Sequence, residues 1–327
     1  HAEIGGLRPG SAYPLARCLA EEGVVLRHLR IVRDGRFDEP GLRRALGEGP
    51  FPSRAPDENI ADVRAQLAAN RKGQTELLGV IERFGWPVTS SYMDHIRAAA
   101  AEKAAAAIEN LPDGVYRFRD ELDDGAPLCL ALTIAGGTLT ADFSGTAPVH
   151  ATSLNATPAI VKAALMYGLR CLIDQDIPLN AGVMAPLRLV LPTGMLNPPA
   201  CADARRHVAV VGGNVELSQK IVDVFFAALG RLAASQGTMN NLVFGNERFG
   251  YYETLCGGAG AGEGFEGASA VHTHMTNTRL TDVEVLEHRF PVRLLRFAIR
   301  RGSGGPGRWR GGDGVIREIQ FLEALSV

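Results

Sequence analysis

Two histidines lie close together in the polar stretch VHTHMTNTR at residues 271–279. On an extended backbone, side chains two residues apart point to the same side, so we expect His272 and His274 to share one face. The same stretch adds the amide of Asn277 and the guanidinium of Arg279. Imidazoles serve as general bases, and guanidinium groups bind carboxylate or phosphate. We therefore expect the wall of a polar active-site cavity, with a merely hydrogen-bonded polar edge strand as the alternative.

His1 and Glu3 open the chain in the sequence HAEIGG. Imidazole nitrogen and carboxylate oxygen are both ligands for a divalent metal ion, which makes the pair a candidate metal site. The H-x-E spacing is common by chance, so the residues alone give only weak support. Because the chain begins in what reads as the middle of a motif, we expect the native protein to have a part that precedes His1.

Two further polar clusters favour the binding of a small polar substrate. Asn214 and Glu216 lie in GGNVELSQ, where we expect a helix to begin with Asn214 or Ser218 as its N-cap. The free N–H groups of a first helical turn suit an anion or a carbonyl oxygen. Asn240 and Asn241 lie in GTMNN, and amides of this kind either line a cavity or form a turn.

The elements that must position these groups are helices in the first half and mostly short strands in the second. A possible capping box at Ser91 and Asp94 predicts the start of the helix that includes residues 98–108. Hydrophobic periodicity and turn residues predict the rest. The other expected helices cover 39–46, 57–84, 158–174 and 218–234, and the expected strands cover 115–118, 128–134, 139–143, 268–275, 283–287 and 315–321.

This pattern predicts an α+β fold with several lobes. We expect a loop-rich segment at 1–56, a helical pair with a β-hairpin at 57–150, and a glycine-rich lobe lining the site at 151–327. An irregular proline-rich stretch covers 178–199.

Composition excludes several classes of function. A formal net charge of -2 gives no broad basic face for nucleic acid, and no apolar run approaches the roughly 20 residues that span a bilayer. The five cysteines are scattered without a C-x-x-C pair, which is typical of reduced thiols in a cytoplasm. No G-x-x-x-x-G-K-[ST] motif is present, so we expect no nucleotide site in this chain.

Taken in order, the motifs closely resemble the hydantoinase B/oxoprolinase family, over essentially the whole chain. Each motif alone is modest, but their shared order is specific. The motifs are HAEIGG at 1–6, QLAANR at 66–71, DFSGT at 142–146, PLNAG at 178–182, GNVELSQ at 213–219, GTMNN at 237–241, YE at 252–253, HTHMTNTR at 272–279 and RWRGGDGV at 308–315.

The resemblance implies a B-type subunit, or a fused half, of an ATP-dependent enzyme that opens cyclic amides such as hydantoins and 5-oxoproline. It implies that an A-type ATPase partner phosphorylates the substrate and that the intermediate reaches a site with a divalent metal (Zn, Mn or Fe) in this chain. His1 matches the family's H-A-D-[IV]-G-G motif, in which Glu3 replaces the usual Asp. The remaining metal ligands of the family lie upstream of this chain.

The same resemblance suggests roles for the residues and leaves two alternatives open. His272 and His274 would act as general bases or as donors on the phosphate side, and Arg279 would pair with carboxylate or phosphate. The residues expected to bind substrate are Asn214, Glu216, Asn240, Asn241 and Asn277. A ketone carboxylase subunit is the second possible activity, and a non-catalytic scaffold is the third. We expect a hetero-oligomeric cytoplasmic enzyme that does not bind nucleic acid or membrane.

Overall fold

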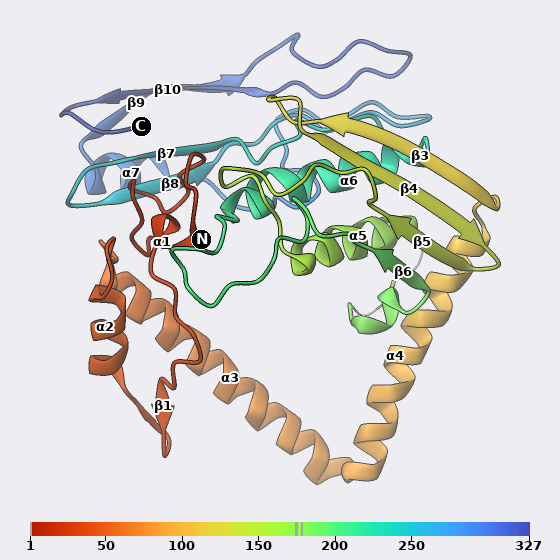
Figure 1. Ribbon diagram of the computed structural model, residues 1–327, viewed down its shortest axis with the longest axis horizontal. Helices are drawn as coiled ribbons and strands as arrows, with labels where there is room; N and C mark the ends of the chain where they lie inside the picture. The colour runs from red at the N-terminus through yellow and green to blue at the C-terminus, as the bar shows by residue number, and fades with distance from the viewer. Residues whose placement is uncertain (1, 174–175, 178) are drawn as a thin grey trace.

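The computed structural model describes residues 2–173, 176–177 and 179–327. His1 and Pro178, both part of motifs used above, lie outside the described residues. Helices and small sheets are interspersed along the chain, which confirms the α+β class (Figure 1). The elements of the N-terminal half are α1 (Leu19–Glu22), β1 (Val32–Arg33), β2 (Arg36–Phe37), α2 (Glu39–Gly47), α3 (Pro56–Phe84), α4 (Trp86–Glu109), β3 (Gly114–Glu121), β4 (Pro127–Ala135) and β5 (Thr138–Asp142). The C-terminal half has α5 (Pro158–Leu172), η1 (Ala181–Met184), β6 (Leu187–Val190), η2 (Gly213–Leu217), α6 (Ser218–Ala228), β7 (Asn241–Gly245), β8 (Gly250–Thr254), α7 (Val283–Arg289), β9 (Val292–Ile299) and β10 (Val315–Phe321).

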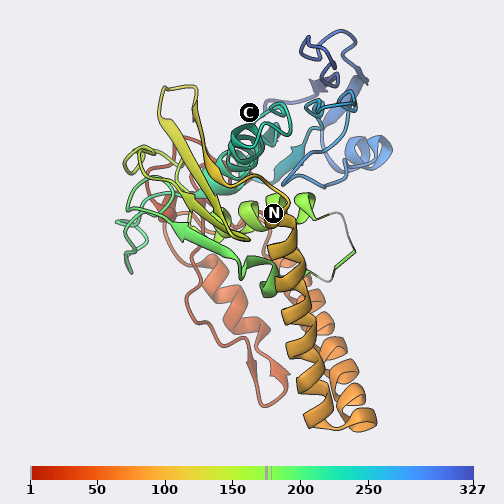
Figure 2. The ribbon, with the colours of Figure 1, turned by 90° about the vertical axis from the view of Figure 1, so that its right-hand side faces the viewer.

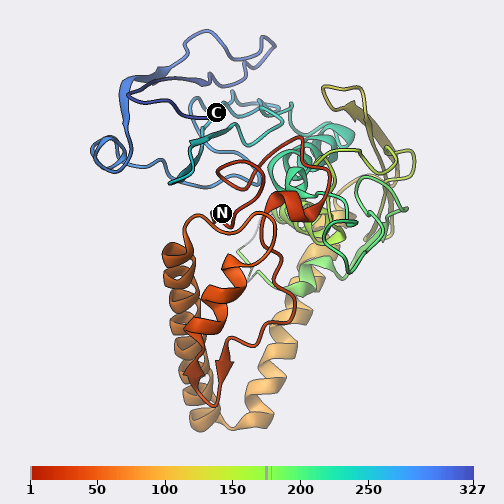
Figure 3. The same cartoon turned by 60° about the vertical axis from the view of Figure 1, so that its left-hand side comes forward.

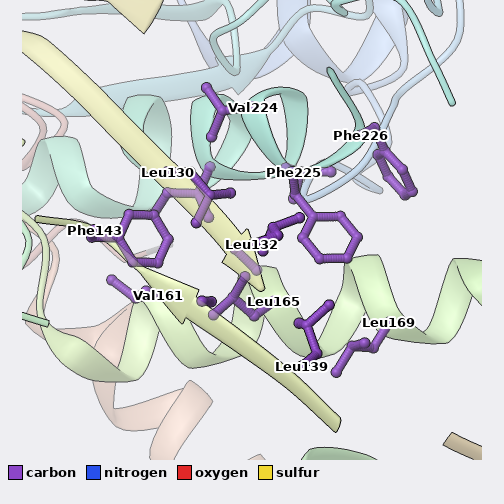
Figure 4. Packing of buried hydrophobic residues seen from close by; sticks show 14 of the residues in the cluster. Leu130, Leu132, Leu139, Phe143, Val161, Leu165, Leu169, Val224, Phe225 and Phe226 are labelled. Carbon is purple, nitrogen blue, oxygen red and sulfur yellow. The ribbon is translucent and has the colours of Figure 1, made fainter. Parts of the chain in front are cut away.

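The main core lies between a four-stranded sheet and two helices. The sheet has the order β3-β4-β5-β6, antiparallel except for the parallel pair β5–β6. Every second residue of β4 from Leu128 to Ile134 is buried, as the period of a strand requires. Helices α5 and α6 cover this face, with Leu165 and Phe225 among the side chains that fill the space (Figure 4). A Cβ on Gly168 would lie 2.8 Å from the Phe225 ring, so glycine lets the two helices approach closely.

Two smaller cores lie beside the main one. The hairpins β7–β8 and β9–β10 pack with α7 around Phe244, Tyr251, Leu286 and Val292, on the side of α6 away from the main sheet (Figure 2). The start of α3 packs against α2 through Leu42, Leu46 and Ile60. Helices α3 and α4 then extend away from the body as a long hairpin (Figure 3). No helix among the described residues combines the length and apolar character needed to cross a membrane.

Several predicted elements are confirmed, and two helices differ at their ends. The helix at α2, the long helix of α3, the hairpin β4–β5, α5 and β10 form as expected. Helix α4 begins at Trp86, so Ser91 lies inside it and caps nothing. Gly85, with φ of 77°, ends α3 and directly precedes α4, and Pro in the first turn starts the new helix. The predicted helix 218–234 ends at Ala228.

Two predicted strands were wrong. Residues 283–287 form helix α7 because Asp282 caps it, its carboxylate accepting hydrogen bonds from the amides of Glu284 and Val285. Residues 268–275 do not form a strand: Val271 makes a single bridge to Gly257, and a turn follows. His274 in that turn has a φ of 54°, which breaks the alternation on which the shared face of the two histidines depended.

The N-cap prediction for the second polar cluster was also wrong. Residues Gly213–Leu217 form a π-helical turn that leads into α6, with Gly212 at the cap position and no side-chain cap. The Ser218 hydroxyl instead donates to the carbonyl of Asn214, inside the helix. The stretch 178–199, expected to be irregular, contains β6, which extends the main sheet.

Candidate functional site

Five of the site residues predicted from the sequence line three separate cavities. Glu3, with Arg54, Tyr251 and Thr281, lines a cavity of about 490 Å³ that we call the Glu3 cavity. Three of the predicted substrate-binding residues line the largest of the three, about 790 Å³, which we call the Glu216 cavity. His274 lines the third, about 540 Å³, which we call the His274 cavity.

The Glu3 carboxylate holds the N-terminal loop together. Its Oε1 accepts from Gly5 N at 2.7 Å and pairs with Arg54 at 3.1 Å, while Oε2 accepts from Gly10 N at 2.6 Å. The side chain is only 6% exposed. A Cβ on Gly250 would lie 2.3 Å from Oε2, so a glycine there leaves room for this carboxylate. Glu3 therefore fixes a loop whose residues line both the Glu3 cavity and the Glu216 cavity.

The described residues do not by themselves fit a metal centre. Glu3, the one predicted ligand among them, already binds a guanidinium and several loop donors. In the described ranges no three His, Cys, Asp or Glu side chains are placed to hold a metal ion. His1, the other predicted ligand, lies outside those ranges. We derive no chemical step through a metal.

The π-helical turn η2, which leads into α6, positions Glu216 in its cavity. Gly212 and Gly213 pack so closely against the backbone of residues 153–156 that a Cβ on either would lie 2.7 Å from it. Glu216 Oε1 accepts a hydrogen bond of 2.6 Å from the Thr238 hydroxyl. Burial raises the pKa of Glu216, the Thr238 hydrogen bond opposes this effect, and the charge of Asp123 adds to it. The cavity thus contains a carboxyl that keeps its proton to higher pH than an exposed glutamate.

Both asparagines line the same cavity, and Asn241 supplies a donor to it. Asn241 Oδ1 accepts from the Tyr252 hydroxyl at 2.6 Å and from the Thr254 hydroxyl at 3.1 Å. Because the oxygen is occupied, the NH₂ group, which donates to no other described residue, remains for a ligand. Asn240 has a φ of 50° and its backbone is held by Thr238 Oγ1 and Leu255 N.

A cation and an ion pair complete the lining of the Glu216 cavity. Lys220, one turn after Glu216, donates to Asp120 Oδ2 at 2.8 Å. Asp124 accepts a hydrogen bond of 2.6 Å from His150, and this bond holds the pKa of Asp124 below its usual value. The cavity therefore offers a protonatable carboxyl, amide donors and an ammonium group within one concave surface.

His274 borders its cavity with a side chain that is itself part of a buried polar network. Its side chain is 6% exposed, and its Nε2 lies 3.3 Å from Asp223 Oδ1, which is equally buried, without hydrogen-bond geometry. Its Nδ1 lies 3.4 Å from the Tyr167 hydroxyl, and its ring packs against those of Tyr167 and Phe226. Burial raises the pKa of Tyr167. The network joins α5, α6 and the 272–276 turn.

The other predicted residues of this stretch have different surroundings. Burial lowers the pKa of His272, and its buried Nδ1 has no hydrogen-bond partner in the described part of the chain. Asn277 and Arg279 are exposed, as is Asn214, and none of the three lines the Glu216 cavity. Glu216, Asn240 and Asn241 are therefore brought together, while His272, His274, Asn277 and Arg279 are not part of that group.

Sequence reasoning missed the residues that support the turn. Gln219, fully buried on α6, donates from Nε2 to Thr273 O at 3.2 Å and accepts from Met275 N at 2.8 Å. Asp223, four residues later on the same helix face, receives hydrogen bonds from the amide and hydroxyl of Ser235. A signal was present, because Gln219 and Asp223 are polar residues four positions apart on a helix with a wide apolar stripe.

Comparisons with known proteins agree along the whole chain. A family model described as hydantoinase B/oxoprolinase matches residues 1–327. The chain is 42% identical to the 5-oxoprolinase of Dictyostelium discoideum, with 100% of this chain aligned to 26% of that protein. It is 39% identical to 5-oxoprolinase 1 of Arabidopsis thaliana, with 100% of this chain aligned to 27% of that protein. The chain thus spans about a quarter of the length of each of these two relatives.

Two solved structures share the fold. The ATP-dependent caprolactamase from Pseudomonas jessenii superposes with a TM-score of 0.82 at 22% identity, covering 98% of this chain and 58% of that one. Acetone carboxylase, in a nucleotide-free structure, gives a TM-score of 0.78 at 18% identity, covering 95% of this chain and 45% of that one. At these identities the likeness concerns the fold alone.

Proposed function

Because the chain belongs to the hydantoinase B/oxoprolinase family, we propose that it is the B-type part of an ATP-dependent enzyme that opens cyclic amides. An A-type ATPase partner phosphorylates the amide oxygen of a hydantoin, 5-oxoproline or another lactam. This chain then carries out the second half-reaction, in which water attacks the activated carbon. The lack of a phosphate-loop motif in the sequence supports this division of labour.

The observation that carries the proposal is the meeting of Glu216, Asn240 and Asn241 in one cavity of about 790 Å³. A volume of this order suits a small ring and its activating group. The Asn241 NH₂ group donates to the oxygen of the activated amide, which orients the ring in the cavity. Lys220 also lines this cavity, and its ammonium group is paired with Asp120.

Glu216 is the acid in this proposal. A first water adds to the activated carbon, and the adduct expels the ring nitrogen, which breaks the C–N bond and leaves an acyl phosphate. A second water then hydrolyses the acyl phosphate to a carboxylate and free phosphate. The departing nitrogen needs a proton, which the protonated Glu216 donates. The raised pKa of Glu216 keeps that proton available at higher pH, and the Thr238 hydrogen bond fixes the carboxyl orientation.

The stretch 272–279 has a positioning role in this account. The contacts of Asp223 and Gln219 with the turn of His274 hold that turn against α6. They thereby help to fix the N-terminal end of α6, which the Glu216 turn directly precedes. A general-base role for His272 and His274, and phosphate binding by Arg279, stay predictions that variants must test. A divalent metal, if bound, requires ligands beyond the described residues.

A substrate screen tests the proposed activity. The chain and its ATPase partner are mixed with ATP and with 5-oxoproline, a hydantoin, a lactam, or a ketone plus bicarbonate, and both phosphate release and product are measured. We expect ring-opened product with one of the cyclic amides. Phosphate release that depends on ketone and bicarbonate would replace the proposal with a ketone carboxylase. Elemental analysis of the same complex identifies any metal.

A further inference from the structure

The Glu216 cavity contains one cation that the proposed reaction does not use. Arg8 lines this cavity together with Lys220, and these two are the only lysine or arginine side chains among its described lining residues. Lys220 is already paired with Asp120. The Arg8 guanidinium, in contrast, lies within ion-pair distance of no carboxylate in the described part of the chain, since Glu3 pairs with Arg54 instead. The cavity therefore has one guanidinium left for a ligand.

The loop that carries Arg8 is held in place on both sides. The Arg54 guanidinium donates to the carbonyl of Arg8 at 3.4 Å, and Glu3 Oε2 accepts from the amide of Gly10 at 2.6 Å. Gly10, with a φ of 86°, lies so close to β7 that a Cβ on it would be 2.2 Å from Val243 Cγ1. The N-terminal loop thus lies directly against β7 (Figure 1), and Arg8 extends from a fixed backbone.

The ring of Tyr13 supports the guanidinium of Arg8. The Cζ atom of Arg8 lies 5.9 Å from the centroid of that ring. A guanidinium that rests on an aromatic ring keeps the N–H groups along its edge free to donate. Tyr13 lines the same cavity, and the carbonyl of Pro14 next to it accepts from the amide and the hydroxyl of Ser153. The ring is therefore fixed as well, which lowers the freedom that Arg8 loses when it binds a ligand.

The position of this loop brings two kinds of donor to one side of the cavity. Asn241 and Val243 are two residues apart on β7 and so share a face of the strand, and both line the cavity. Because Gly10 packs on Val243, the loop of Arg8 borders the same side as the free NH₂ group of Asn241. The acidic side chains of the lining belong to other elements, the β3–β4 turn and η2. An anionic group is thus favoured on the β7 side of the cavity.

We propose that Arg8 binds an oxyanion of the ligand in the Glu216 cavity and is therefore a specificity-determining residue. This inference rests on the proposed function, in which an activated cyclic amide occupies the cavity. A guanidinium binds carboxylate or phosphate through two parallel hydrogen bonds. Two groups of such a ligand have this chemistry, a carboxylate on the ring, as in 5-oxoproline, and the phosphoryl group that activates the amide. An uncharged lactam carries only the second.

Calorimetric titration of the purified chain tests the proposal and separates the two groups. The probes are 5-oxoproline, its uncharged counterpart 2-pyrrolidinone, and inorganic phosphate. We expect Arg8→Met to raise the Kd of 5-oxoproline or of phosphate by at least about tenfold, or 1.4 kcal/mol, and to leave the Kd of 2-pyrrolidinone unchanged. Weaker binding of 5-oxoproline identifies the ring carboxylate as the group that Arg8 binds. Weaker binding of phosphate alone identifies the phosphoryl group.

A second arginine of the N-terminal segment provides the matched control. Arg17 is exposed like Arg8 but does not line the cavity, so Arg17→Met should leave every Kd unchanged. Circular dichroism verifies that both variants are folded. Equal Kd values of wild type and Arg8→Met for 5-oxoproline and for phosphate would overturn the proposal, as would an equal loss in Arg17→Met. The titration needs neither ATP nor the ATPase partner, so its outcome is independent of the substrate screen, whose failure would instead remove the proposed function.

Discussion

On one face of the continuous helix formed by η2 and α6 the polar side chains line an open cavity, whereas on another face they are buried and bonded to the rest of the protein. Glu216 and Lys220 line the Glu216 cavity, where Asn241 leaves its NH₂ group for a ligand. Gln219 and Asp223 instead hold the turn that contains His274. A polar group that faces a cavity can act on a ligand, while one enclosed by protein is committed to structure. The difference assigns the chemistry to Glu216 and the positioning to the turn.

The largest expected effect separates the two regions by activity. Glu216→Gln removes the proton donor but keeps nearly the same shape, so turnover should fall by about 10²- to 10⁴-fold while the melting temperature changes little. Ring-opened product is measured with the ATPase partner present. Glu284→Gln, at an exposed site on α7, is the matched control. Unchanged turnover in Glu216→Gln would end the assignment of the acid.

Replacement of the buried Gln219 should lower the stability of the protein, whereas Glu216→Gln should lower its turnover. Gln219→Ala leaves Met275 N without a partner among the described residues and removes one of the three hydrogen bonds to Thr273 O, which should cost about 1 to 3 kcal/mol. Urea denaturation measures the loss. Gln66→Ala, on the exposed surface of α3, should change stability by less than about 0.5 kcal/mol. Similar losses for the two variants would contradict the importance of the buried contacts.

His274→Ala decides between positioning and catalysis. Loss of a ring packed against Tyr167 and Phe226 should reduce the free energy of unfolding by about 2 kcal/mol. Turnover per folded molecule should stay within a few-fold of wild type, because the ring does not line the Glu216 cavity. A drop as large as that of Glu216→Gln in a fully folded His274→Ala protein would instead favour the predicted general base.

The pH dependence gives a more moderate effect with a definite sign. An acid works only in its protonated form, so the turnover of the second half-reaction should fall about tenfold per pH unit above the pKa of Glu216. Burial raises that pKa, so the decline begins at a higher pH than for an exposed glutamate. Thr238→Val removes the opposing hydrogen bond and should move the decline to still higher pH. A decline at the same pH in both proteins would show that another group titrates.

The sequence predicted most of the fold because the relevant patterns are local. The alternation of β4 and the long apolar periodicity of α3 each specify their element without help from distant residues. The strand prediction for residues 268–275 was wrong because the structure there depends on Gln219, which lies about fifty residues earlier in the chain. Residues 283–287 alternate like a strand, but the Asp282 cap favours a helix.

The sequence predicted only part of the site, because local patterns indicate polar residues but not the distant residues that they contact. Glu216, Asn240 and Asn241 were selected as polar residues near a helix start and a turn, and the fold brings them together. No spacing in the sequence indicates that Asp223 lies beside His274, since that contact needs the packing of α6 against a loop. Nor does the sequence show that the Glu3 carboxylate is occupied by its own loop.

The smallest expected effect concerns a residue outside the cavity. Asn214→Ala should leave KM and stability nearly unchanged, within about 0.5 kcal/mol, because Asn214 is exposed and does not line the Glu216 cavity. Asn241→Ala, in the same assay, should raise KM by at least about tenfold, since it removes a donor to the substrate. Equal effects of the two substitutions would remove the distinction between cavity and surface.

The most direct test of the central claim is a crystal structure of the complex with the cyclic amide that the substrate screen selects. We predict that the ring lies in the Glu216 cavity, with its amide oxygen within hydrogen-bond distance of the Asn241 NH₂ group and its nitrogen near the Glu216 carboxyl. A ring bound in the Glu3 cavity, or beside His274, would contradict the account.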